Sequence, residues 1–303
     1  MENLRQRIQA LPKGDVHSHL HLSASEDLLK AHYPDSSLTI PEYYDGFEGM
    51  MRFINQQIKP IITSCEIAIS FMDLGIKSSI ADHVTRLEAS VDYNLIELFD
   101  NSVLKFIEAI AGLKRKYAGL LDFRPEIGFN KNNQIDEIYG NAMACMESGV
   151  FHGLDIYGNE IGRDLSEFRP LFLNAKYKGL KTKVHIGEFE GPLSIETAVK
   201  LLEPDEIQHG IHAVKSEKTL QMILERGIRL NICPQSNISL GIVKNLHSHP
   251  IRKLYDAGIN ITINTDDLLL FNATLTDQYV SLLEQGVFSF KELDEIRLNA
   301  LLQ

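Results

Sequence analysis

Few of the residues that stabilise small or secreted domains occur in this chain of 303 residues. It contains no tryptophan and three widely spaced cysteines, Cys65, Cys145 and Cys233. An odd number of distant cysteines predicts neither a disulfide framework nor a paired-cysteine metal site. Because disulfides persist mainly in oxidising compartments, the composition favours a cytoplasmic protein.

Positive charge and long apolar runs are scarce as well. The 30 lysines and arginines are outnumbered by 41 aspartates and glutamates, which gives a formal net charge of −11. That charge repels polyphosphates at long range, so we expect no nucleic-acid partner. No segment approaches the ~20 apolar residues of a membrane span, and the charged N-terminus MENLRQRIQALPKGD lacks the apolar run of a secretory signal. We therefore expect a soluble protein with no membrane partner, and the sequence leaves a homo-oligomer open.

What the chain does contain is a regular alternation of short apolar segments and longer stretches of helical period. This pattern is typical of parallel βαβ units. The predicted strands lie near Asp15 to Leu20, Val84 to Tyr93, Leu121 to Asn130, Gly153 to Tyr157, Lys181 to His185, Glu206 to His209, Ile228 to Cys233 and Ile259 to Asn264. Eight strands close a barrel, so we predict an α/β fold, a (β/α)₈ TIM barrel, in one domain over residues 1–303.

The connection between the first two predicted strands is longer than one crossover helix requires. It exceeds sixty residues and has helical character near 26–31 and 49–62. Excess chain at such a connection commonly forms a lid or a substrate wall. The stretch MMRFINQQI, with Met50, Met51, Phe53 and Ile54, fits an apolar lid that contacts substrate through Phe53, or equally a helix that packs onto the barrel.

Two histidines lie at the end of the first predicted strand. His17 and His19 are two residues apart, so in a strand both imidazoles point to the same face. In a barrel that face is the interior, and active sites lie at the C-terminal ends of the strands. Neutral imidazole is a good Zn²⁺ ligand, although a lone HxH pair is weak evidence for a metal site.

Polar residues recur at the ends of later predicted strands. They are His185 and Glu188 in VHIGE, His209 in QHG, and Asp266 with Asp267 in NTDD. Parallel strand ends meet at one rim, where three imidazoles and a carboxylate could surround one cation and leave a position for water. The alternative is that each is a buried polar residue with a purely structural partner.

Five segments, in this order, resemble the motifs of the adenosine deaminase family. They are HSH at 17–19, HIGE at 185–188, HG at 209–210, CPQSN at 233–237 and NTDD at 264–267. The resemblance runs from residue 11 to about residue 275. It implies that His17, His19, His185 and Asp266 bind one Zn²⁺ per chain, and that the enzyme deaminates a small purine-type substrate.

The resemblance also implies roles for four further residues. Glu188 corresponds to a proton shuttle that protonates a ring nitrogen of the purine, and His209 to the residue that orients the attacking oxygen. Asp267 corresponds to a residue that hydrogen-bonds the imidazole side of the purine. Gly158, in DIYGNE, corresponds to a glycine whose backbone approaches the ring, which a Cβ would obstruct.

One segment departs from the family pattern. After the two histidines the family usually has leucine, an acidic residue and glycine, whereas this chain has Leu20, His21 and Leu22. An imidazole both donates and accepts, so recognition of a ribose hydroxyl does not follow automatically. We consider His21 a candidate substrate contact, with packing as the alternative, and expect an adenosine-like, adenine-like or modified aminopurine substrate.

Other polar residues near these motifs have simpler interpretations. Asp155 and Glu160 are interpreted as packing or helix-start residues, Cys233 as an inert buried thiol, and Asn237 as support for its loop. His249, with its neighbour His247, is interpreted as an anchor for a helix start near Pro250.

Three other functions remain as alternatives. The same metal barrel could hydrolyse a non-purine substrate such as a cyclic amide, since the pocket and not the fold sets the substrate. A catalytically silent binding paralogue would typically lack the shuttle or a ligand, but Glu188, His209 and the four ligand positions are all present. A cytidine-type deaminase is disfavoured, because its HxE and PCxxC signature is absent.

Overall fold

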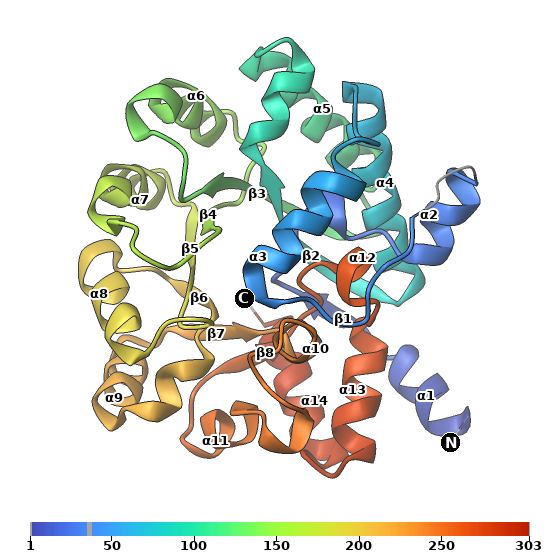
Figure 1. Cartoon of the computed structure of the whole chain (residues 1–303), viewed down its shortest axis with the longest axis vertical. Helices are drawn as coiled ribbons and strands as arrows, with labels where there is room; N and C mark the ends of the chain where they lie inside the picture. Colours follow the sequence, from blue (N-terminus) through green and yellow to red (C-terminus); the bar gives the residue numbers. More distant parts are fainter. Residues whose placement is uncertain (1, 35–37, 303) are drawn as a thin grey trace.

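The computed structural model describes residues 2–34 and 38–302, and its centre is one sheet of eight parallel strands in sequential order. The strands are β1 (Lys13–Asp15), β2 (Val84–Asp92), β3 (Asp122–Asn130), β4 (Gly153–Tyr157), β5 (Lys181–Ile186), β6 (Glu206–His209), β7 (Arg229–Ile232) and β8 (Ile261–Ile263). Helices surround the strands on the outside (Figure 1). The predicted (β/α)₈ TIM barrel is confirmed.

Helices follow every strand, and many begin at a serine that caps the first turn. Ser64, Ser102 and Ser216, for example, each accept the backbone N–H three residues further on. The helices are α1 (Glu2–Gln9), α2 (Glu26–His32), α3 (Gly46–Phe53), α4 (Cys65–Ala81), α5 (Val103–Lys116), α6 (Ile135–Glu147), α7 (Arg169–Tyr177), α8 (Pro192–Leu202), α9 (Glu217–Arg226), α10 (Pro234–Ser239), α11 (Ile251–Asp256), α12 (Leu268–Phe271), α13 (Leu275–Glu284) and α14 (Phe290–Asn299). Within the described residues, no helix combines the length and apolar character that crossing a bilayer requires.

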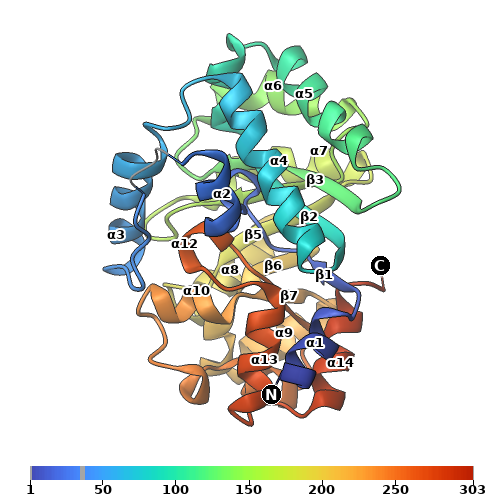
Figure 2. The same ribbon diagram turned by 90° about the vertical axis from the view of Figure 1, so that its right-hand side faces the viewer.

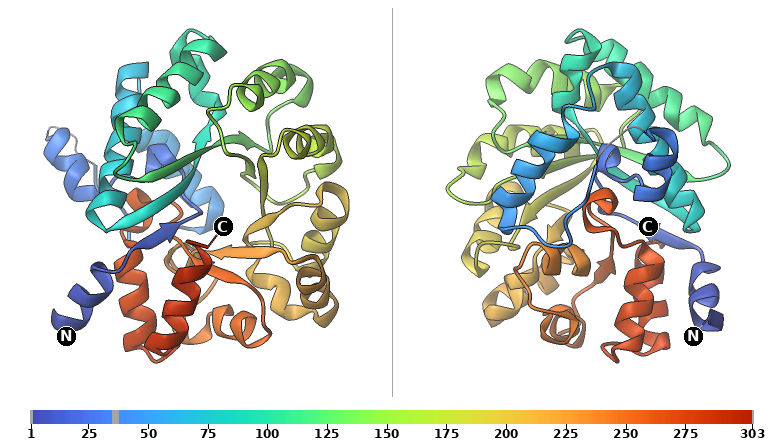
Figure 3. Two further views of the ribbon diagram at one scale, coloured as in Figure 1. Left: turned by 180° about the vertical axis from the view of Figure 1, so that it is seen from behind. Right: turned by 45° about the vertical axis from the view of Figure 1, so that its right-hand side comes forward.

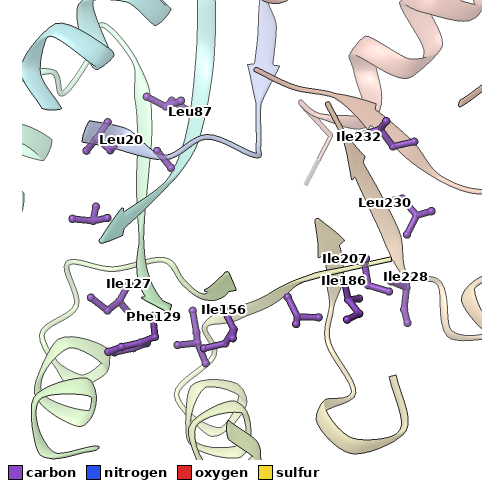
Figure 4. Packing of buried hydrophobic residues seen from close by; sticks show 14 of the residues in the cluster. Leu20, Leu87, Ile127, Phe129, Ile156, Ile186, Ile207, Ile228, Leu230 and Ile232 are labelled. Carbon is purple, nitrogen blue, oxygen red and sulfur yellow. The ribbon is translucent and has the colours of Figure 1, made fainter. Parts of the chain in front are cut away.

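Side chains alternate between two environments along each strand. On β7, Leu230 and Ile232 belong to the main hydrophobic core, whereas Arg229 and Asn231 form polar contacts inside the barrel. Figure 4 shows Leu230 and Ile232 with the apolar side chains of neighbouring strands. The outer layer therefore holds the helices by apolar packing, and the interior is left for polar residues.

A buried ionic cluster fills the barrel below the strand ends. Lys183 Nζ lies 2.7 Å from Glu88, 2.8 Å from Glu126 and 3.5 Å from Glu206. Arg229 adds a contact of 2.7 Å to Glu206. All five side chains are almost inaccessible to solvent, so each charge depends on the others for compensation.

The first strand is shorter than predicted. A strand over Asp15 to Leu20 was expected, but the regular pairing of β1 ends at Asp15 and residues 20–22 form a 3₁₀ turn. The chain between them bonds alternately to its two neighbours: His19 N–H donates to Asp266 O (3.1 Å), Asp266 N–H to His17 O (2.9 Å) and Ser90 N–H to Ser18 O (2.7 Å). The segment after β8 is thus joined to the segment after β1 by isolated hydrogen bonds and not by a regular strand ladder.

The long connection after β1 forms the predicted extra helices. It contains α2, α3 and α4, with a π-helical turn at Ile54–Ile58 that continues α3. Its apolar side chains form a second cluster with α12, which includes Met50, Ile54, Phe71 and Leu270. Figure 2 shows α3 at one end of the barrel, with the C-terminus on the other side, and the view from behind in Figure 3 shows the C-terminus facing the reader.

Candidate active site

Four histidines from three separate segments of the sequence, His17 with His19, His185 and His209, meet at the C-terminal mouth of the barrel. The ring centroid of His17 lies 4.7 Å from that of His185 and 4.5 Å from that of His209. The ring of His19 lies 5.2 Å from that of His185. The structure therefore brings together the imidazoles that the sequence placed at separate strand ends.

Left-handed backbone conformations aim two of the site residues into the mouth. His209 lies two residues after Ile207, and in a regular strand two such side chains point to the same face. Ile207 packs in the outer core, so a regular strand would direct His209 outward. Its φ of +65° turns the side chain inward instead, and Asp266 has a φ of +62°. Such conformations cost a non-glycine residue roughly 1–2 kcal/mol and cluster at functional sites.

Asp266 lies between two of the histidines. Its Oδ1 is 3.4 Å from His17 Nε2 and 3.6 Å from His19 Nε2, while Ser236 Oγ donates to its Oδ2 at 2.7 Å. Ligands held at ~2.0–2.1 Å around a tetrahedral ion are themselves about 3.3 Å apart. The spacing of these atoms therefore suits a shared cation.

The donor nitrogens of the histidines are also prepared for a metal. Burial lowers the pKa of His17, but the negative charge of Asp266 raises it overall. In the neutral ring, Nδ1 donates to Asn231 O at 3.0 Å and Nε2 is unprotonated; this buried Nε2 has no hydrogen-bond partner among the described residues. Ring nitrogens of His17, His19 and His185 lie within 4.8 Å of one another. Burial lowers the pKa of His185 to about 4, so its imidazole is neutral at pH 7. The residues present fit a transition-metal ion.

Cys233 lies nearby but on the far side of the His17 ring. Its Sγ is 3.3 Å from Nδ1, whereas Asp266 faces Nε2. Burial raises the pKa of the Cys233 thiol well above its usual range, so it stays protonated. Cys233 also forms a second group of possible ligands with His17, His209 and Asp266, and its interpretation as an inert buried thiol stays a prediction.

Glu188 lies beside His209 in the same mouth. Asn237 Nδ2 donates to Glu188 Oε1 at 2.6 Å, and His209 Nδ1 lies 3.4 Å from the same oxygen. Burial raises the pKa of Glu188 well above its usual range, and the negative charge of Asp266 raises it further. Both effects favour the neutral carboxyl group, which is the form that an acid catalyst needs.

A cavity of about 450 Å³ connects these residues with the lid. One wall is polar, and the opposite wall is formed by apolar side chains of α3 and the π-helical turn, including Phe47, Met50 and Met51. The predicted residues that line the cavity are His19, His21, Gly158, His185, Glu188, His209, Asp266 and Asp267. Its volume is in the range of small-molecule sites.

The remaining predicted substrate contacts occupy different places. His21 follows the strand in the 3₁₀ turn, and its buried Nδ1 has no hydrogen-bond partner among the described residues. Gly158 has a φ of +100°, and a Cβ there would lie 2.9 Å from the Asn130 side chain. Phe53 is not among the lining residues: its ring packs 5.8 Å from that of Tyr44, and Phe47 faces the cavity instead.

The sequence interpretation underestimated two buried residues, Asp155 and Glu160, and did not identify a third, Lys131. Asp155 Oδ2 lies 3.1 Å from His185 Nε2, and Glu160 accepts the backbone N–H groups of the four residues 187–190. Lys131 Nζ donates to His185 O at 2.6 Å. Lys131 and Glu160 lie just beyond strand ends, the same signal that identified the histidines, whereas Asp155 lies in the middle of β4; the partners of all three come from β5 and the loop that follows it.

The match to known proteins extends over the whole barrel. The family model for adenosine deaminase matches residues 127–303. A putative adenosine/adenine deaminase from Treponema pallidum (strain Nichols) is 33% identical over 281 residues, which cover 92% of this chain and 93% of that protein.

Solved structures share the fold at lower identity. The N6-mAMP deaminase of Arabidopsis superposes with a TM-score of 0.82 at 19% identity, over 98% of this chain and 94% of that one. A zinc-bound amidohydrolase from Burkholderia ambifaria gives a TM-score of 0.81 at 21% identity, over 98% and 86% of the two chains. Since the family model spans more than half of the sequence and the bacterial relative nearly all of it, this chain belongs to the adenosine deaminase family of metal-dependent hydrolases.

Proposed function

We propose that this protein is a zinc-dependent deaminase that removes the exocyclic amino group of a purine base or nucleoside by hydrolysis and releases ammonia. The observation that carries the proposal is the position of the Glu188 carboxyl group in the same cavity as His19, His185 and Asp266, with the buried His17 beside His185 and Asp266. Acid and metal site together are what hydrolytic removal of an amino group requires.

The metal ligands in this proposal are His17, His19, His185 and Asp266, which would hold one Zn²⁺. When bound, zinc acts as a Lewis acid and lowers the pKa of a water molecule towards neutrality. The protein itself holds the ligands in place, because Asn231 O orients His17 and Ser236 orients Asp266.

Three further residues act on the substrate. Glu188 protonates a ring nitrogen, which makes the adjacent carbon that bears the amino group more electrophilic. His209 orients the attacking oxygen and stabilises the developing negative charge. Its Nε2 lies 3.9 Å from Asp266, on the side of the metal ligands. Asp267, whose Oδ1 is buried without a hydrogen-bond partner among the described residues, bonds the imidazole side of the purine.

The cavity wall indicates how the substrate is held. The purine ring lies against the backbone at Gly158, and the apolar side chains of α3 cover its other side. Among the described residues that line the cavity, acidic side chains outnumber basic ones, and Lys59 is the single lysine or arginine. A negatively charged phosphate would be repelled there, so an uncharged base or nucleoside is favoured over a phosphorylated one. His21, with a free ring nitrogen, is the candidate contact for a polar substituent.

We also propose that residues 1–303 act as one cytoplasmic domain. All eight strands belong to one sheet, which spans residues 13–263. The three cysteines are unpaired, as expected in a reducing compartment.

The test is ammonia release from adenine, adenosine and N6-modified aminopurine nucleosides, with the zinc content measured on the same sample. We expect turnover of at least one aminopurine by protein that holds about one zinc per chain. A zinc-loaded protein that releases ammonia from none of them, but hydrolyses a cyclic amide, would show that the function is a different one.

A further inference from the structure

The carboxyl group of Glu188 is connected to the start of α11 by a chain of three hydrogen bonds. Ile251 N–H donates to His249 Nδ1 at 3.0 Å, and His249 Nε2 lies 3.0 Å from Asn237 Oδ1. Asn237 Nδ2 then donates to Glu188 Oε1 at 2.6 Å. Asn237 and His249 are buried, with 0% and 3% of their surface exposed, so water does not compete for these bonds.

The hydrogen bond from Ile251 to His249 determines which group donates and which accepts in the other two hydrogen bonds. A backbone N–H can only donate, so His249 Nδ1 must accept the hydrogen bond from Ile251. A neutral imidazole then carries its proton on Nε2, and this N–H donates to Asn237. The amide of Asn237 must therefore direct its oxygen at His249 and its nitrogen at Glu188.

His249 stays neutral at the pH at which the enzyme works. Burial lowers its pKa to about 3. Protonation of Nδ1, which would break the bond to Ile251, is thus excluded at neutral pH. The direction of the chain does not reverse in the physiological range.

The hydrogen bond from Asn237 to Glu188 determines which carboxyl oxygen of Glu188 carries the proton. Both close contacts of its carboxyl group, with Asn237 Nδ2 and with His209 Nδ1, are made by Oε1. An oxygen that accepts from an N–H donor does not also direct its own proton at that donor. The proton of the neutral acid is therefore left to Oε2.

The backbone of Glu188 is held separately. Glu160 accepts the N–H groups of Gly187, Glu188, Phe189 and Glu190 at distances of 3.0–3.3 Å. Changes at Asn237 or His249 therefore leave the loop anchored and alter only the carboxyl group at its end.

We propose that Asn237 and His249 are positioning residues, which hold the acidic proton of Glu188 on Oε2 and so direct it at the ring nitrogen of the substrate. This inference rests on the deaminase function proposed above. Without the N–H of His249, the Asn237 amide is free to rotate and present its oxygen to Glu188, which would then place its proton on Oε1, in a hydrogen bond to Asn237. We expect kcat to fall by about 10- to 100-fold, less than on loss of the acid itself.

Two variants of His249 separate this role from the anchoring of α11. The His249→Asn side chain keeps an acceptor at the position of Nδ1 for Ile251 N–H, but does not reach Asn237. The His249→Gln side chain places an amide N–H where Nε2 was and loses the acceptor for Ile251. We expect His249→Asn to lose kcat with little change in KM and in zinc content, and His249→Gln to retain most of its kcat although it unfolds at a lower temperature.

Two results would overturn the inference. One is a wild-type kcat in His249→Asn, and the other is a kcat that follows the melting temperature, with His249→Gln the poorer enzyme. Should either variant fold poorly, Asn237→Asp offers a further test, because it replaces the N–H donor by an oxygen in a side chain of the same shape. We expect this variant to lose kcat as well, and wild-type turnover by Asn237→Asp would also overturn the inference. Absence of ammonia release by the wild-type protein would instead refute the proposed function.

Discussion

At the scale of single residues, the raised pKa of Glu188 gives the most direct prediction. Glu188→Gln keeps the shape of the side chain and an oxygen to accept from Asn237, but its amide cannot transfer a proton. We expect kcat to fall by about 10²- to 10⁴-fold, while the zinc content stays at the wild-type level. Steady-state kinetics and elemental analysis measure the two quantities. Turnover close to that of the wild-type protein would contradict the assigned role.

Ser236 gives a second prediction at this scale, because it orients a proposed metal ligand. Its hydroxyl group donates to Asp266 Oδ2 at 2.7 Å. Ser236→Ala should lower the zinc affinity by about 10- to 100-fold, and Asp266→Ala should lower it further. Competition with a chelator measures the affinity. Ser239→Ala on the same helix is the control, since that hydroxyl group contacts Gln235 instead; equal losses in both serine variants would show that the effect is not specific to Asp266.

At the scale of elements, α3 is the part of the lid that faces the cavity. Phe47 lines the cavity and packs against Phe189 with ring centroids 5.7 Å apart, so it ties the lid to the β5–α8 loop. Phe47→Ala should raise KM by about tenfold and change kcat much less, because it removes apolar contact that ground and transition states share. Phe53→Ala is the comparison: Phe53 packs on Tyr44, so its KM should stay near that of the wild-type protein. A larger rise in KM for Phe53→Ala would favour the contact predicted from the sequence.

At the scale of the whole molecule, the barrel depends on the buried ionic cluster beneath the site. Lys183 contacts Glu88, Glu126 and Glu206 and is itself fully buried. Lys183→Met removes the cation of Glu126, while Glu88 and Glu206 keep only Arg86 and Arg229, so we expect the free energy of unfolding to fall by about 3–5 kcal/mol. Lys77→Met, which breaks an exposed ion pair with Asp73, should cost less than about 1 kcal/mol. Denaturant unfolding measures both, and similar midpoints for the two variants would contradict this account.

The strands and the strand-end residues could be predicted because both depend on local sequence. Apolar runs located seven of the strands to within a few residues, and the polar residues after them identified His185, Glu188 and His209. The order of the five motifs indicated the family, and the resemblance to that family implied the proposed ligand set. The first strand was predicted to extend to Leu20 but ends at Asp15, because the segment after it is held by bonds from Asp266 and Ser90.

The chain by itself thus determined the barrel, the family and the residues that gather at its mouth, since periodicity and motif order are properties of one continuous segment after another. The tertiary structure alone decided the partners of those residues: the φ of +65° that turns His209 inward, the contact of Asp155 with His185, and the bonds that join His249, Asn237 and Glu188. A buried hydrogen bond joins whichever donors and acceptors neighbouring strands bring within reach, and that neighbourhood exists only once the barrel has closed.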